Sequence, residues 1–241
     1  IHDEPLEQII PVMERSNQMM LSQLTMHHVE KVGLLKMDIL GLRNLSLLDD
    51  ILLNIKRTHG QTLDVYQFPM NDEATLALFK MADTNGVFQF ESEGIKNVLR
   101  NLQPSEFEDI VAVNALFRPG PMQQIDEYIK RKKQQVPVEY LHPLLEPILK
   151  STYGIIIYQE QVMQICQQLA GFTLGQADIL RRAMGKKQAD VMQREQAHFI
   201  EGAQERGIES DLAQKIYHYI EAFASYGFNR SHAVVYSTLA Y

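Results

Sequence analysis

The segment LAGFTLGQADILRRAMGKK (169–187) indicates a helical fold, because its pattern predicts the end of one helix at 170 and the start of another at 174. Thr173 followed by Gln176 is a capping-box pattern, which marks a helix N-terminus. Apolar residues then recur at helical spacing and form the expected core face: Leu174, Ala177, Leu180 and Met184. We therefore expect an amphipathic helix over 174–185.

The opposite face of this helix carries a polar stripe. Asp178, Arg182 and Lys186 are spaced i, i+4, i+8, with Arg181 and Lys187 beside them. Arginine can bind phosphate oxygens in bidentate fashion, and lysine adds a compact positive charge. On spacing alone, the stripe is more typical of a solvated basic face with an Asp–Arg pair worth about 0.3–0.5 kcal/mol.

Outward from this segment, periodicity and capping patterns predict a mainly helical chain with a small β component. Ser105 followed by Glu108 is a capping-box pattern that opens a helix ending before Arg118. Further helices are expected over 44–57, 72–82, 122–133, 141–150, 159–170, 188–206 and 211–224. A brief extended piece is expected over 86–90.

One strand is expected near the start, where polar and apolar residues alternate over 35–39. The alternation would place Lys36 and Asp38 on the same face. A carboxylate on a rigid strand beside a glycine turn can present a metal ligand. Most aspartates at strand ends are instead solvated or cap the next turn, so this signal is weak by itself.

A third cluster, YGFNRSH (226–232), places several groups of different chemistry next to a glycine. Its aromatic rings could stack on a base for about 1–3 kcal/mol, and its polar groups could reach phosphate or sugar. The competing interpretation is a corner between two helices with packed rings. The residues of interest are Tyr226, Asn229, Arg230, Ser231 and His232.

Composition indicates a globular protein with 45% hydrophobic and 22% charged residues. The net charge of −7 argues against a protein that simply coats nucleic acid. Basic residues are concentrated locally, at 130–133 and around the stripe at 178–187. No apolar run approaches the roughly 18 residues of a membrane span, and no P-loop or dinucleotide-binding glycine motif is present.

Cys166 is the one cysteine in the chain, so an intramolecular disulfide is impossible and a reducing cytoplasm is expected. It belongs to the apolar face of the predicted helix 159–170. We expect a buried core thiol, the usual role of an unpaired cysteine.

Six segments in order resemble the bacterial DNA polymerase III α subunits, the C-family replicative polymerases. They are KVGLLKMDILGLRNL (31–45), GVFQFES (86–92), LFRPGPM (116–122), YGIIIYQEQVMQI (153–165), LAGFTLGQADILRRAMGKK (169–187) and YGFNRSHAVVYS (226–237). Their order and spacing agree with the family over nearly the whole chain. Ile39 and the pair Val234–Val235 depart from the residues usual there, as packing variations.

The resemblance implies a division into the C-terminal part of a polymerase-β-like palm (1–60) and a helical fingers domain (61–241). Asp38 matches the third of three metal-binding aspartates, which together hold two Mg²⁺ ions, and Lys36 matches the lysine beside it. Residues implied to meet the incoming triphosphate are Arg181, Arg182, Lys186 and Lys187. Those implied to line the nascent base pair or template are Tyr226, Asn229, Arg230 and His232.

The implied activity is template-directed DNA synthesis from dNTPs by two-metal nucleotidyl transfer in the bacterial cytoplasm. The implied partners are primer–template DNA, dNTPs and replisome subunits such as the sliding clamp, the last through regions absent here, and no membrane. The chain lacks the Asp-x-Asp motif of the other two carboxylates and starts at Ile1 without Met. We therefore expect a fragment that is inactive alone. The alternative is a stand-alone helical nucleic-acid-binding or scaffold domain.

Overall fold

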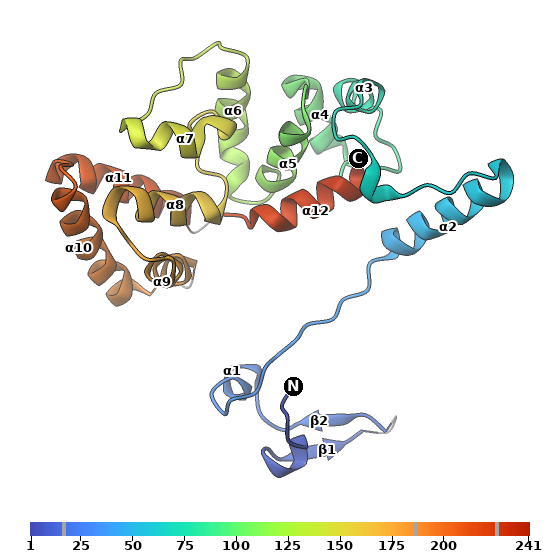
Figure 1. Ribbon diagram of the computed structural model, residues 1–241, viewed down its shortest axis with the longest axis horizontal. Coiled ribbons are helices and arrows are strands. Elements are labelled where there is room, and N and C mark those ends of the chain that lie inside the picture. Colours follow the sequence, from blue (N-terminus) through green and yellow to red (C-terminus); the bar gives the residue numbers. More distant parts are fainter. Residues whose placement is uncertain (16–17, 186–187, 225–226) are drawn as a thin grey trace. The chain divides into compact units, whose positions relative to one another are not determined.

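The computed structural model describes residues 1–15, 18–185, 188–224 and 227–241. The chain divides into two compact units, Ile1–Asp64 and Val65–Tyr241. The structure is mainly helical, as predicted, and its described β structure is one two-stranded sheet together with an isolated bridge (Figure 1). The two units are described separately below.

The first unit begins with an antiparallel hairpin of β1 (Val12–Glu14) and β2 (Met20–Ser22), followed by the single-turn α1 (Met26–Val29). The prediction of a strand at 35–39 is wrong, because residues 33–42 have neither helix nor strand. A strand needs a neighbour to pair its backbone groups, and the hairpin strands pair only with each other. Ile39 is 94% exposed, so the alternation of apolar residues here buries nothing within the unit.

The long helix α2 (Arg43–His59) confirms the helix expected over 44–57. It ends at Gly60, which adopts the left-handed conformation (φ 69°) that glycine takes without steric cost. None of its residues is buried, although leucines and isoleucines recur along it at helical spacing.

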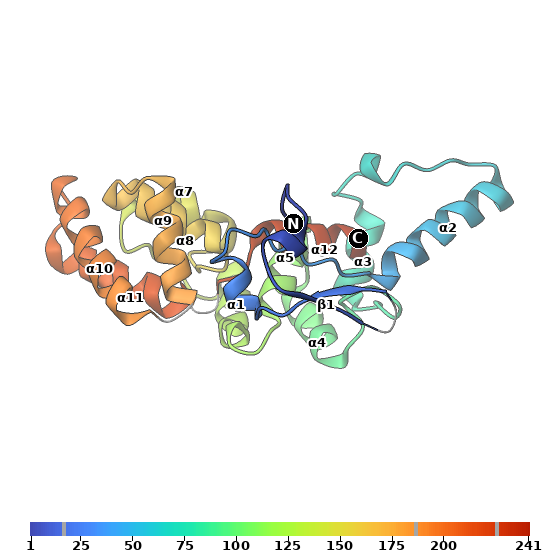
Figure 2. The same ribbon diagram turned by 90° about the horizontal axis from the view of Figure 1, so that it is seen from below.

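The second unit contains the remaining helices, which surround two adjoining hydrophobic clusters. Their bounds are α3 (Glu73–Met81), α4 (Glu93–Leu102), α5 (Phe107–Leu116), α6 (Ile125–Lys132), α7 (Glu146–Leu149), α8 (Gln159–Ala170), α9 (Leu174–Gly185), α10 (Ala189–Glu205), α11 (Ser210–Ala224) and α12 (Arg230–Ala240). Figure 2 shows α8 to α11 grouped at one end of this unit, and α3, α4, α5 and α12 grouped at the other.

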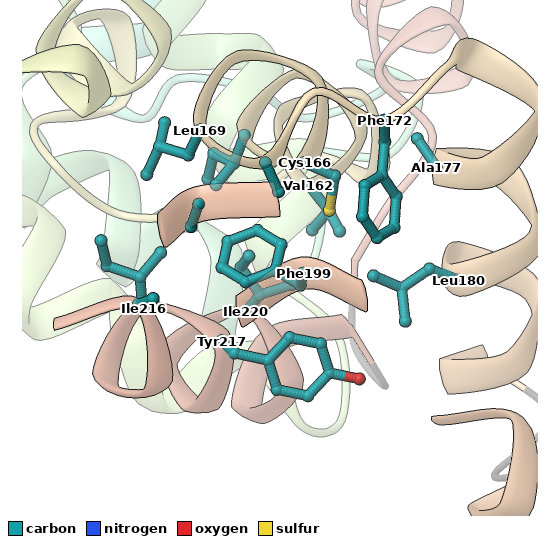
Figure 3. Packing of buried hydrophobic residues seen from close by; sticks show 14 of the residues in the cluster. Val162, Cys166, Leu169, Phe172, Ala177, Leu180, Phe199, Ile216, Tyr217 and Ile220 are labelled. Carbon is teal, nitrogen blue, oxygen red and sulfur yellow. The ribbon is translucent and has the colours of Figure 1, made fainter. Parts of the chain in front are cut away.

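The first cluster is built by α8, α9, α10 and α11, which pack against one another (Figure 3). The ring of Phe199 lies between those of Phe172 and Tyr217, with centroids 6.2 and 5.6 Å away. The bounds predicted for α8 are confirmed to the residue, and α9 begins at the predicted Leu174 and is helical through Gly185, the last described residue before the gap at 186–187. Thr173 and Gln176 also make the predicted cap, since Gln176 Oε1 accepts hydrogen bonds from the Thr173 N–H and hydroxyl.

The second cluster lies under α3 to α6 and is closed by α12, a helix that the sequence patterns did not predict. Helix α12 packs along α5, which is buried over nearly its whole length. At its end, the Tyr241 hydroxyl accepts a 2.7 Å hydrogen bond from the Asp72 N–H, at the start of α3. The C-terminal segment therefore returns to the first helix of its own unit.

Three further expectations need correction. Residues 86–90 form turns rather than an extended piece. The capping box of α5 involves Glu106 and Asp109, one residue later than predicted. The helix expected over 122–133 is a 3-10 turn at Pro121–Gln124 followed by α6, and the helix expected over 141–150, which contains Pro143 and Pro147, is divided into 3-10 turns at Pro143–Leu145 and Lys150–Thr152 on either side of α7.

Candidate nucleotide and nucleic-acid site

The polar stripe of α9 is organised around one carboxylate. Asp178 Oδ1 lies 2.7 Å from Arg181 Nη2, and Asp178 Oδ2 lies 2.8 Å from Arg182 Nε. The Arg181 hydrogen bond lowers the pKa of Asp178 against the opposing effect of partial burial, and the charges of both arginines lower it further. A single ionised carboxylate thus holds two neighbouring guanidinium groups on one face of the helix.

The two arginines differ in exposure. The Arg181 side chain is 27% exposed, whereas that of Arg182 is 66% exposed. Two guanidinium groups held side by side suit the binding of phosphate oxygens. Lys186 and Lys187, predicted to extend this stripe, lie outside the described residues.

The 227–232 segment leads into the N-terminus of α12. Asn229 is the N-cap residue, and its side-chain oxygen accepts a 2.8 Å hydrogen bond from the His232 N–H. Arg230 donates to Glu108 on α5 at 2.6 Å. Tyr226, the remaining predicted residue of this cluster, lies outside the described residues. The packed-corner interpretation therefore describes this segment well, while Asn229, Arg230 and His232 stay exposed.

Ring and cation contacts run along the side of α12 as a ladder of five residues. Arg118 lies over the Phe228 ring at 4.2 Å, and the Phe228 and His232 ring centroids are 5.3 Å apart. His232 stacks on Tyr236 at 4.1 Å, and Tyr236 contacts Phe88 at 5.2 Å. These contacts set the orientation of the His232 ring.

The start of α8 connects the stripe of α9 to this segment. Gln159 Oε1 accepts a hydrogen bond from Arg181 Nη1 at 3.1 Å, while Gln159 Nε2 donates to the Gly227 carbonyl at 2.9 Å. Glu160 accepts from the Arg230 backbone N–H at 3.0 Å and from Asn229 Nδ2 at 3.1 Å. The α9 stripe at 178–182 and the 227–230 segment, which are 45 or more positions apart in the sequence, thus both contact the start of α8.

In the first unit, Lys36 Nζ lies 2.8 Å from Asp38 Oδ2, and the Asp38 side chain is 79% exposed. The two residues that the sequence placed on one face therefore lie together, although on an irregular segment rather than a strand. One exposed carboxylate paired with a lysine does not hold a metal ion by itself. Throughout the described ranges, no group of three or more His, Cys, Asp or Glu could do so.

Comparison with known families matches both parts of the chain. Residues 44–207 match the bacterial DNA polymerase III alpha subunit finger domain, and residues 1–41 match the bacterial DNA polymerase III alpha NTPase domain. The chain belongs to the bacterial DNA polymerase III α subunit family. The resemblance drawn from the six segments is thus confirmed, as is the assignment of a fingers domain.

Similar DNA polymerase III α subunits occur in Halalkalibacterium halodurans, 52% identical, and Staphylococcus aureus strain Mu50, 50% identical. Both similarities extend over all 241 residues of this chain and 22% of the relative's length. The chain therefore spans about a fifth of the relatives that it matches. Within its described part, no helix is both long and apolar enough to cross a membrane.

Sequence reasoning missed Gln159 and Glu160 as functional candidates in this polymerase III α chain. Both lie in the segment YGIIIYQEQVMQI (153–165), but their contacts are with residues 22 to 70 positions away. Charge spacing within a helix carries no signal for such long-range contacts. The sequence feature that could have indicated them is that this segment is one of the six that resemble the family.

The basic run at 130–133 is less open than its sequence indicates, because two of its side chains form ion pairs and hydrogen bonds within the second unit. Arg131 donates to Glu127 at 2.8 Å and to the Tyr153 carbonyl at 3.1 Å. Lys132 pairs at 2.7 Å with the fully buried Asp109. This run is therefore not the open basic patch that its sequence suggested.

Proposed function

We propose that this chain supplies the fingers and the adjoining palm segment of a replicative DNA polymerase that synthesises DNA from dNTPs on a template. The second unit is the fingers domain and the first is the C-terminal part of the palm. The observation that carries the proposal is the pair of guanidinium groups that Asp178 holds. Gln159 links this pair to the 227–230 segment by hydrogen bonds to Arg181 and to the Gly227 carbonyl. Family membership supports it.

Arg181 and Arg182 would bind the triphosphate of the incoming nucleotide. Positive groups in this role offset the negative charge that develops on the phosphoryl oxygens during transfer. Lys186 and Lys187 would add to the same charge. Asp178 holds both guanidinium groups in place by its ion pairs with them. Its negative charge also reduces the repulsion between the two arginines when no phosphate is bound.

Residues around the start of α12 would contact the template and the base and sugar of the nucleotide: Tyr226, Asn229, Arg230 and His232. His232 is exposed and held by ring contacts on both sides, which is how a stacking or hydrogen-bonding group is kept in place. The Asn229 amide oxygen accepts the cap hydrogen bond and its nitrogen donates one hydrogen to Glu160, so the second N–H of the amide is what it offers a ligand.

Asp38 would supply one carboxylate toward a divalent metal site, with Mg²⁺ as the ion, and Lys36 would neutralise charge beside it. The other ligands would come from parts of the polymerase outside this chain. When bound, such ions activate the primer hydroxyl and stabilise the leaving pyrophosphate. We expect this chain alone to be inactive, and the whole enzyme to work in the bacterial cytoplasm with primer–template DNA and a sliding clamp.

The test of the nucleotide site is Arg182→Ala in the full-length polymerase. We expect kcat/KM for the nucleotide to fall about 10²–10³-fold, as for a lost charge-stabilising donor, while the affinity for primer–template DNA stays near wild type. Arg100→Ala is the matched control, because Arg100 is also exposed and sits in a surface ion pair, with Glu93 on the same helix. Unchanged nucleotide kinetics for Arg182→Ala would return the stripe to a solvated surface.

The test of the palm assignment is Asp38→Ala, also in the full-length polymerase. We expect primer extension to be abolished while the thermal unfolding temperature is unchanged, because the side chain is exposed and its ion pair with Lys36 lies at the surface. Measurable primer extension by this variant would remove Asp38 from the site.

A further inference from the structure

We infer that Gln159 is a positioning residue for nucleotide binding, which couples the orientation of Arg181 to the position of the 227–230 segment. The inference rests on the proposed function, since it gives Arg181 a role only if Arg181 meets the nucleotide. Gln159 itself is not expected to touch the substrate. It acts through the two groups that its side-chain amide contacts.

The chemistry of its partners determines which way the Gln159 amide faces. Arginine has only N–H donors, so Arg181 must meet the amide oxygen. A backbone carbonyl only accepts, so Gly227 must meet the amide nitrogen. The contacts of 3.1 and 2.9 Å are consistent with this single orientation. Neither a carboxylate nor an apolar side chain of the same length could satisfy both partners.

On the α9 side, Gln159 completes the restraint of the Arg181 guanidinium. Asp178 binds the Nε and Nη2 edge, at 2.9 and 2.7 Å, and Gln159 binds Nη1. The guanidinium is thereby held from two directions, and the planar group has one orientation rather than several. A group pre-oriented in this way loses less entropy when it binds a phosphate oxygen.

On the other side, the start of α8 holds the 227–230 segment with backbone as well as side-chain contacts. Tyr158 and Phe228 form a parallel bridge, with Gln159 N–H donating to the Phe228 carbonyl at 2.9 Å. The two segments pack closely here, since a Cβ atom on Gly227 would lie 3.3 Å from Gln159 Cγ. A shift of this segment therefore moves the amide that orients Arg181.

The experiment measures single-nucleotide incorporation by the full-length polymerase carrying Gln159→Leu, which keeps an uncharged side chain and removes both side-chain hydrogen bonds. We expect the nucleotide KM to rise about tenfold, as for loss of a hydrogen bond to a charged group, with kcat changed less than about threefold. Gln164→Leu is the control, because Gln164 is exposed on the same helix. A loss of packing alone would lower the unfolding temperature without this KM-specific effect.

A double-mutant cycle with Arg181→Ala decides whether the effect passes through Arg181. We expect the double variant to have the nucleotide KM of Arg181→Ala alone. Additive effects would overturn the inference. A wild-type KM for Gln159→Leu, together with a raised KM for Arg181→Ala, would also overturn the inference but would leave the proposed function intact. A wild-type KM for Arg181→Ala would overturn both the inference about Gln159 and the proposed role of Arg181 in nucleotide binding.

Gln159→Glu is a second variant that separates the two contacts of the amide. Its carboxylate still accepts from Arg181 but cannot donate to Gly227. We therefore expect a KM between those of the wild type and Gln159→Leu, and a wild-type or a Leu-like value would contradict the two-sided role of the amide.

Discussion

The pair formed by Lys132 and Asp109 shows how strongly one residue can depend on another. Asp109 is fully buried, and its Oδ2 accepts from Lys132 Nζ at 2.7 Å and from the Ser105 N–H at 2.8 Å. Burial by itself lowers the pKa of Lys132, but the hydrogen bond and charge of Asp109 outweigh this and leave the pKa raised. Lys132 therefore stays charged at neutral pH and is the cationic partner of this buried carboxyl group.

We expect Lys132→Met to lower the free energy of unfolding by about 3–5 kcal/mol, because it leaves a buried carboxylate without its partner. Urea unfolding at pH 7 measures the change. Asp109→Asn combined with Lys132→Met should recover part of the loss, since no buried charge remains. A loss below about 1 kcal/mol for the single variant would show that water reaches the pair.

The same pair predicts a pH dependence. A lysine whose folded pKa is raised contributes stability that is complete below its ordinary pKa and is lost as pH rises through the folded value. We therefore expect the wild-type chain to lose stability above about pH 10.5 more steeply than Lys132→Met. Unfolding temperatures between pH 8 and 11 compare the two, and parallel curves would contradict the expectation.

Cys166 gives a residue-level measure of opening. Its side chain is fully buried, and burial raises the pKa of the thiol to about 12. We expect almost no reaction with a disulfide reagent at pH 8 in the folded chain, and complete reaction in urea, since the thiolate is the reactive form. Rapid reaction without denaturant would show that the first core cluster opens easily.

At the scale of elements, the crossing of α8 and α10 depends on a glycine. A Cβ atom on Gly202 would lie 2.2 Å from the Ala170 carbonyl oxygen, too close for the two helices to keep their packing. We expect Gly202→Ala to destabilise the chain by about 1–3 kcal/mol, as for other overpacked sites, although alanine favours a helix. Gly175→Ala on α9 is the control, because its Cβ would meet open space. Its expected effect on thermal unfolding is neutral to stabilising.

How much of the fold the sequence predicts also depends on the element. Helices with their own caps and a clear apolar face, such as α8 and the start of α9, were predicted to the residue. In the described structure, the segment 35–39 has a strand-like pattern but no partner strand, and the helix expected over 141–150 is divided at its prolines. Such outcomes depend on neighbours in space, which local patterns do not contain.

The candidate site follows the same division. Spacing alone placed Asp178 and Arg182 on one face, and their ion pair is present. The roles assigned to these residues came from the resemblance rather than from spacing. Gln159 and Glu160 were missed because their contacts join distant parts of the chain.

At the scale of the whole chain, the two compact units should differ in their resistance to proteolysis. Both core clusters lie within Val65–Tyr241, whereas α2 in the first unit has no buried residue. We expect limited digestion with a nonspecific protease to cut within 35–64 first and to leave a stable fragment close to 65–241. Mass spectrometry identifies the fragments. Early cuts within α8 to α11 would contradict this division.

The fully buried Cys166 has a practical consequence for spectroscopy. Because this is the one cysteine of the chain and it is shielded by the core, a cysteine introduced at an exposed position would be the one site open to a thiol-reactive dye. Gln168 on α8 and Lys215 on α11 are exposed positions on opposite partners of the same core. A fluorophore at either could report motions of the fingers without first removing the native thiol, and the chain contains no tryptophan to interfere with its emission.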